Sequence, residues 1–142
     1  MNILISIIGA ILALSFIIVV HEFGHYWVAR RCGVFVERFS IGFGRALYSR
    51  TLANGMEFKI GWLPLGGYVK LRGDELDKTH PNRDDHYANK PVWQRMLIVL
   101  AGPMINFLLA IIIYWGIYLA GIPTIKPIIQ AIAPNTPAAQ AN

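Results

Sequence analysis

The sequence has little charge, and two long stretches have none. Only 15% of its 142 residues are charged, whereas 55% are hydrophobic, and this balance is far from that of an ordinary soluble domain. No charged residue occurs in residues 3–20 or in residues 96–125. Each stretch is long enough for the roughly 20 residues that a helix needs to cross a bilayer. The composition therefore excludes a typical soluble protein and predicts two transmembrane helices in contact with the lipid bilayer.

No lysine or arginine precedes the first apolar stretch, and no small-residue cleavage site closes it, so we expect a retained helix rather than a signal peptide. Of the 13 basic residues, all but Lys126 lie between Arg30 and Arg95. The positive-inside rule therefore places this connecting segment in the cytoplasm. Acidic residues are interleaved with the basic ones, so we interpret the net charge of +5 as a topology signal and expect no nucleic-acid partner.

The sequence contains a single cysteine, Cys32, which excludes a disulfide within the chain. It falls just past the expected cytoplasmic end of the first helix, where the compartment is reducing. We interpret Cys32 as a bystander, and a role as a metal ligand stays open as the alternative.

Glycine and proline punctuate the rest of the chain. The first helix should occupy residues 1–31, because no proline interrupts it and Gly33 supplies a stop. In residues 32–72, β-branched and aromatic residues are mixed with glycines, and Asn54 followed by Gly55 is a turn signal. This pattern predicts a β-hairpin-like loop. Its apolar side chains suit a loop that is associated with the membrane and packs beside the helices.

The remaining segments complete a five-part division of the chain. Residues 73–90 are polar and predict a solvated cytoplasmic loop, in which His80 and His86 are expected at the surface. A second transmembrane helix over residues 91–121 should begin near Pro91, whose fixed φ suits a helix N-terminus. Residues 122–142 begin like a soluble β-rich domain, but so few residues cannot bury a core, so we expect a truncated domain. The predicted fold class is a membrane protein that is mainly α, with a β-hairpin-like membrane-associated loop.

Three residues at the end of the first helix carry the chemistry. His21 and His25 are four positions apart, which places two imidazoles one helical turn apart on one face, within reach of a single zinc ion. Glu22 flanks the same site. Such groups on an apolar membrane helix cost on the order of a few kcal/mol unless they are paired, so they mark a functional site, and the alternative is a polar helix terminus in headgroup-level water. We predict His21 and His25 as metal ligands and Glu22 as the catalytic base.

Peptide hydrolysis is the reaction that this set predicts. Zinc lowers the pKa of its water from about 15.7 to about 7 and polarises a carbonyl, and Glu22 would take the proton of the water and pass it to the leaving nitrogen. Catalytic zinc generally has three protein ligands, yet no aspartate, glutamate or histidine follows His86. We therefore expect an amino-terminal fragment that lacks the third ligand and is inactive by itself.

Over nearly its whole length, the chain resembles the site-2 protease family of intramembrane zinc metalloproteases. The resemblance is carried by residues 21–34, 38–44, 64–70 and 101–103, and by Asn106. It implies that the zinc ligands fall on His21 and His25 and the base on Glu22. It also implies that the β loop presents substrate as an added strand and that the third ligand is an aspartate on a later helix. Residues 122–142 resemble the start of a periplasmic PDZ-like domain.

Pro103 and Asn106 match a family element near the active site, for which we expect a structural role in helix packing. The resemblance further implies a multi-pass protein of the bacterial inner membrane, with its active site toward the cytoplasm. Its substrates would be single-span membrane proteins, such as an anti-sigma factor, cut in regulated intramembrane proteolysis. The alternative is a non-cleaving two-helix membrane binding or regulatory protein, which the missing third ligand favours. The natural substrate and the oligomeric state stay open.

Overall fold

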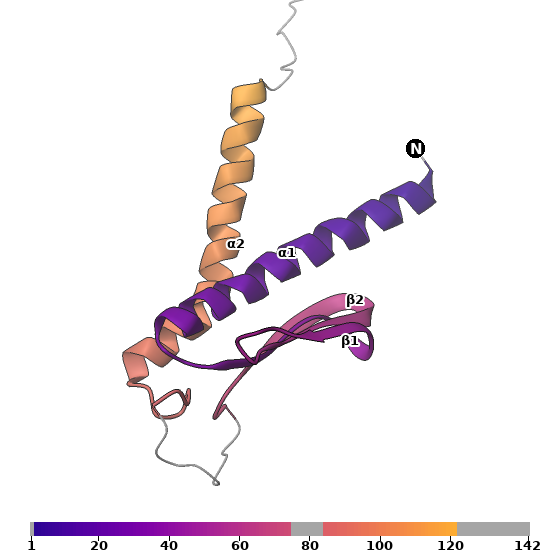
Figure 1. Cartoon of the computed structure of the whole chain (residues 1–142). Coiled ribbons are helices and arrows are strands. Elements are labelled where there is room, and N and C mark those ends of the chain that lie inside the picture. Colours follow the sequence, from indigo (N-terminus) through magenta and orange to yellow (C-terminus); the bar gives the residue numbers. More distant parts are fainter. Residues whose placement is uncertain (1, 75–83, 122–142) are drawn as a thin grey trace, which may run out of the picture. The chain divides into compact units, whose positions relative to one another are not determined.

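The computed structural model describes residues 2–74 and 84–121, which form, in chain order, a helix, two strands and a second helix (Figure 1). In chain order the elements are α1 (Ile3–Arg31), β1 (Val36–Thr51), β2 (Glu57–Leu71) and α2 (Val92–Ala120). Both helices have 29 residues and are long and apolar enough to cross a membrane. The predicted helices and hairpin are confirmed. The predicted PDZ-like start at residues 122–142 lies outside the described residues, as does His80.

The chain divides into two compact units, Met1–Ile111 and Ile112–Asn142. The described part of the second unit is the last portion of α2 and Gly121. Gly121 directly follows the helix and has a φ of 84°. All of the contacts described below lie within the first unit.

The carboxyl end of α1 is built from local signals. Arg30 and Arg31 occupy the last turn, where positive charge interacts favourably with the helix dipole. Gly33 follows with a φ of 70°, and its N–H donates to the carbonyl oxygen of Arg30 at 3.2 Å. This left-handed position is open to glycine at no steric cost. The chain can therefore reverse within a few residues and enter β1.

The turn between the strands has the chemistry that the sequence predicts. Gly55 has a φ of 83°, and the N–H of Met56 donates to Oδ1 of Asn54 at 3.1 Å. Just beyond the turn, Ser49 Oγ and Arg38 Nε donate to the two carboxylate oxygens of Glu57, at 2.7 and 2.6 Å. These hydrogen bonds lower the pKa of the Glu57 carboxyl below its usual value, and the bond from Ser49 has the larger effect.

β1 and β2 are antiparallel, and the long strands bend so that one part of β1 is flanked on both sides. Arg38 is partnered with both Lys70 and Glu57, and the same double pairing continues through residue 41. Residues 38–41 therefore lie between two parts of β2. Within the described part of the chain, residues 67–71 pair with only one segment of β1, which leaves their other side as a sheet edge.

The core lies where the end of α1, the base of the hairpin and α2 meet. Its buried residues are Ala29, Val34, Val36, Phe39, Met56, Leu71 and Ile98. They come from all four elements or the residues between them. This small core ties the predicted zinc motif of α1 to both the sheet and α2.

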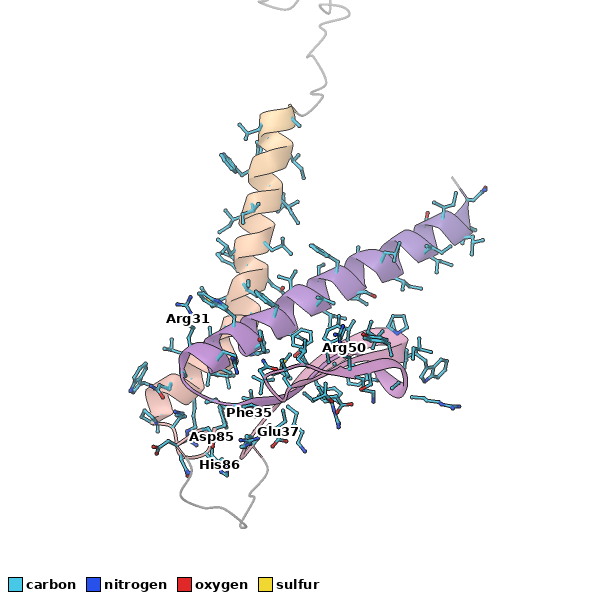
Figure 2. All side chains as sticks on the ribbon, in the orientation of Figure 1. Arg31, Phe35, Glu37, Arg50, Asp85 and His86 are labelled. Atoms are coloured by element: carbon cyan, nitrogen blue, oxygen red, sulfur yellow. The ribbon has the colours of Figure 1, made fainter. Side chains whose placement is uncertain are left out.

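The expectation that His86 lies at the surface is wrong, because its side chain is only 4% exposed. The segment around it folds back against the base of the hairpin (Figure 2). The Phe35 N–H donates to the Asp85 carbonyl oxygen at 3.0 Å, and the Tyr87 N–H donates to that of Arg72 at 2.8 Å. These backbone bonds join segments that are distant in sequence, so local polarity could not predict the burial.

Gly24 marks the crossing of α1 and α2. A Cβ at Gly24 would lie 2.6 Å from the backbone oxygen of Ala101 and 2.8 Å from Cγ2 of Ile105. A helix backbone cannot yield locally, so Gly24→Ala should push the helices apart. We expect a loss of about 1–3 kcal/mol in the free energy of unfolding, as is typical of overpacking. The unfolding transition in detergent micelles measures it.

Gly9→Ala is the matched control, because nothing lies within 4 Å of a Cβ at Gly9 on the same helix. It should leave the transition unchanged or raise it slightly, since alanine favours helix over glycine. Equal effects of the two substitutions would contradict a close helix crossing at Gly24.

Candidate active site

The imidazoles of His21 and His25 lie side by side on one face of α1. Their Nε2 atoms are 3.2 Å apart, and the rings meet edge to face with centroids separated by 4.8 Å. Two nitrogens bound to one zinc ion at about 2.0–2.1 Å with tetrahedral angles are separated by about 3.3 Å. The separation in the structure therefore fits two positions of a tetrahedral zinc site.

α2 meets this histidine pair with a residue that has no side chain. A Cβ at Gly102 would lie 2.7 Å from His21 Nε2 and would overlap His25 Nε2. Gly102 directly precedes Pro103, which lies inside α2. The two rings can therefore lie this close to α2 only because residue 102 is glycine.

α2 also holds the other nitrogen of each ring. His25 Nδ1 lies 2.7 Å from the carbonyl oxygen of Ile98, and because a carbonyl only accepts, Nδ1 must donate and Nε2 keeps its lone pair. His21 Nδ1 lies 3.2 Å from the side-chain amide of Asn106. Histidines that bind metals generally have such an outer partner. From the sequence we expected only a role in helix packing for Asn106, and the structure adds a contact with a predicted ligand.

Glu22 lies between α1 and the edge of the sheet. Its Cγ would be 3.1 Å from a Cβ at Gly67 in β2, so the carboxylate side chain packs against the strand. Glu22 and His25 line a cavity of about 170 Å³ whose other lining residues are Val69, Leu71, Asp74, Tyr87, Ile98 and Val99. The predicted base, one predicted ligand and the sheet edge therefore share one space.

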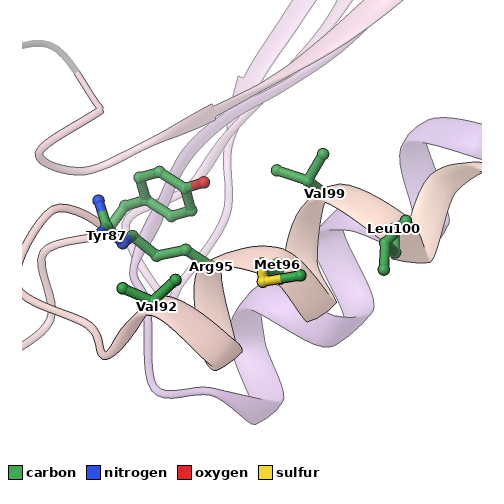
Figure 3. A pocket seen from close by; sticks show the side chains of 6 residues that line it. All are labelled: Tyr87, Val92, Arg95, Met96, Val99 and Leu100. Atoms are coloured by element: carbon green, nitrogen blue, oxygen red, sulfur yellow. The ribbon is translucent and has the colours of Figure 1, made fainter.

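A larger cavity of about 430 Å³ opens beside the first turns of α2 (Figure 3). Its lining residues are Tyr87, Val92, Arg95, Met96, Val99 and Leu100. Tyr87 and Val99 also line the smaller cavity, but none of the three predicted site residues reaches the larger one. The larger cavity is therefore not the one that contains predicted site residues.

Within residues 2–74 and 84–121, no group of three or more histidine, cysteine, aspartate or glutamate side chains could hold a metal ion. Cys32, the alternative ligand, caps the end of α1 and packs partly buried against the core. His86 is buried at the base of the hairpin. The structure thus brings the two predicted ligands together, and it forms no cluster of three such side chains within the described residues.

Comparison with known proteins agrees with these observations. Residues 9–140 match the model of peptidase family M50. The chain is 52% identical to the protease RseP of Yersinia pestis over 143 residues, which is 100% of this chain and 32% of that protein. It is 51% identical to the regulator of sigma-E protease RseP of Escherichia coli K12 over 132 residues, which is 92% of this chain and 29% of that protein.

A Vibrio cholerae protein whose name assigns it provisionally to the zinc metalloproteases is 46% identical over 141 residues, which is 99% of this chain and 31% of that protein. The chain spans about a third of the length of these relatives. The family match extends over most of the chain, and its two apolar helices are those of a membrane protein. The chain therefore belongs to peptidase family M50, the site-2 protease family of zinc metalloproteases.

Proposed function

We propose that this chain supplies the zinc-binding and proton-transferring part of an intramembrane endopeptidase, with His21 and His25 as ligands and Glu22 as the base. The observation that carries the proposal is the 3.2 Å separation of the two Nε2 atoms in front of Gly102. The family and the protease names of the relatives support the same reaction class. The third ligand would come from outside the described residues.

Each of the three side chains has a distinct task in this proposal. Bound zinc would polarise the scissile carbonyl and acidify a water molecule. His21 and His25 would hold the ion from α1. The Glu22 carboxylate accepts a proton from the attacking water as the new carbon–oxygen bond forms, and it returns the proton to the nitrogen as the carbon–nitrogen bond breaks. Amide and water become carboxylic acid and amine.

The edge of β2 suits an extended peptide substrate. Residues 67–71 pair with only one segment of β1 in the described part of the chain, while Val69 and Leu71 line the cavity that contains Glu22. A peptide added as a strand along this edge gains main-chain hydrogen bonds. A membrane helix must lose its internal hydrogen bonds before it can be cut, so such bonds replace what unwinding removes. We therefore propose a locally unwound segment of a single-span membrane protein as substrate.

The remaining assignments rest on charge and on the relatives. The basic residues between Arg30 and Arg95 favour a cytoplasmic position for this connecting segment and for the active site beside it. The bacterial relatives support our proposal of a multi-pass protein of the inner membrane. One relative is named regulator of sigma-E protease, a name that fits a substrate controlling a sigma factor. An anti-sigma factor is therefore our proposed example of the substrate class.

Zinc content tests the proposed ligands. In protein isolated from membranes, His21→Ala and His25→Ala should each weaken zinc binding by more than the roughly 10- to 100-fold that loss of an outer partner costs. Competition with a chelator measures this affinity. His86→Gln is the control, because this histidine is buried at the base of the hairpin and does not line the cavity that contains Glu22 and His25. Wild-type affinity in both alanine variants would overturn the proposed site.

A non-cleaving membrane binding or regulatory protein is the second candidate. It is favoured by the absence of a cluster of three potential metal ligands from residues 2–74 and 84–121. This second candidate shares the zinc-binding prediction, but it predicts that the wild-type protein does not cleave. Activity, rather than metal content, therefore distinguishes the two candidates.

A further inference from the structure

We propose that Asn106 is a positioning residue that switches the proton on His21 between its two ring nitrogens, so that the pair is hydrogen-bonded without metal and ready to bind when metal arrives. This inference rests on the proposed function, since it concerns the same zinc site. It starts from a difference between the partners of the two histidines. His25 faces a backbone carbonyl, and His21 faces a side-chain amide.

The partner of His25 allows only one arrangement of hydrogen. The carbonyl oxygen of Ile98, 2.7 Å from Nδ1, has no hydrogen to give, so the neutral ring keeps its proton on Nδ1. Its Nε2 is then always an acceptor. The backbone of α2 has preset His25 for binding through Nε2.

The partner of His21 allows two arrangements. An asparagine amide has a donor end and an acceptor end of nearly equal size. With Nδ2 of Asn106 toward His21 Nδ1, at 3.2 Å, the ring proton sits on Nε2 and points at His25 Nε2, 3.2 Å away. This arrangement satisfies the metal-free pair, but it leaves no lone pair on His21 Nε2 for a metal.

A half-turn of the amide produces the second arrangement. Oδ1 of Asn106 then accepts a hydrogen bond from Nδ1–H of His21, and Nε2 loses its hydrogen and faces the same space as His25 Nε2. Oδ1 is already buried and has no hydrogen-bond partner among the described residues. A buried acceptor without a partner is costly; the half-turn gives Oδ1 a partner, while Nδ2 takes its former position. The Asn106 amide can therefore pair with His21 in either form. Its Nδ2 donates to a bare Nδ1, and its Oδ1 accepts from a protonated Nδ1.

Two substitutions at this position separate positioning from packing. Asn106→Leu keeps a similar volume but can neither donate nor accept, so zinc affinity should fall by about 10- to 100-fold. Asn106→Asp can only accept, so it should retain or tighten zinc binding. Phe107→Leu is the control on α2, because Phe107 is 64% exposed, and it should bind zinc like the wild type.

The spectroscopic signature is the position of the His21 ring proton. In the metal-free wild type, nitrogen NMR of the imidazoles should show a bare Nδ1 on His21, whereas Asn106→Asp should show Nδ1 protonated. A merely structural role would not move this proton. A bare Nδ1 in Asn106→Asp, or wild-type zinc affinity in a folded Asn106→Leu, would overturn the inference.

The outcomes also separate this inference from the proposed function. If His21→Ala and His25→Ala leave zinc binding unchanged, the proposed site itself fails. If those variants lose zinc while the Asn106 variants behave like the wild type, the site stands and only the role of Asn106 fails. Should Asn106→Leu not fold, the ring-proton measurement on Asn106→Asp decides the question alone.

Discussion

Glu22→Gln is expected to abolish cleavage of a single-span membrane substrate while leaving bound zinc in place. Glutamine matches glutamate in size, so packing against Gly67 is kept, but its amide cannot accept the proton of the attacking water. General-base catalysis contributes about 10²- to 10⁴-fold, so the rate should fall at least about 100-fold. The measurement is cleavage of a reporter substrate in vesicles by the protein isolated from its native membranes. The zinc content of the same preparation is measured alongside.

Glu37→Gln is the matched control for this substitution. Glu37 lies near Arg72 and Lys70, with nitrogen–oxygen distances of 3.5 and 3.7 Å, and it does not line the cavity that contains Glu22. Its loss should leave cleavage unchanged. Cleavage at the wild-type rate by Glu22→Gln would refute the role of Glu22, and a zinc-loaded wild type without any cleavage would favour the non-cleaving alternative.

Gly102→Ala is expected to remove zinc binding while the protein stays folded. The added methyl group would occupy the space in front of His21 Nε2 and His25 Nε2, so the rings must rotate away and their nitrogens can no longer converge. Because imidazoles are the free ends of flexible side chains, they can move without displacing the helices. Zinc affinity should fall by more than the roughly 10- to 100-fold expected for an outer partner, as measured by chelator competition.

Gly116→Ala on the same helix is the control, since nothing lies within 4 Å of a Cβ there. Alanine is more favourable than glycine in a helix by about 0.8–1.0 kcal/mol, so local helix stability cannot explain a loss of zinc at residue 102. The contrast with Gly24 is also informative, because a Cβ at Gly24 meets backbone and should disturb the fold. Wild-type zinc binding in Gly102→Ala would show that no ion lies between the two Nε2 atoms.

Much of the fold followed from the sequence because the signals are local. The charge-free stretches predicted both helices, since crossing a bilayer demands a continuous apolar run. The turn at Asn54 and Gly55 was predicted because such residues tolerate the backbone angles that a tight turn needs. The contact of His21 with His25 was also predicted, since residues four apart meet on any helix. Their role as ligands, like that of Glu22, stays a prediction that the experiments above test.

Other features depended on segments that meet only in the folded chain. The burial of His86 requires its segment to return to the base of the hairpin, and polarity alone predicted the opposite. The flanking of residues 38–41 on both sides depends on how two long strands bend. No periodic pattern in a single segment carries this information, because each contact joins residues far apart in the chain. The predicted PDZ-like start lies outside the described residues and stays a prediction.

The sequence by itself determined the family, the two apolar helices, and the presence of two imidazoles and a carboxylate within one turn. Only the tertiary structure decided what faces them. Gly102 and Asn106 reach the histidines because α1 crosses α2 closely at Gly24, and the crossing selects which side chains of α2 point inward. The spacing along one helix is local geometry, whereas the space for an ion and the partner of each ring nitrogen are properties of two packed helices.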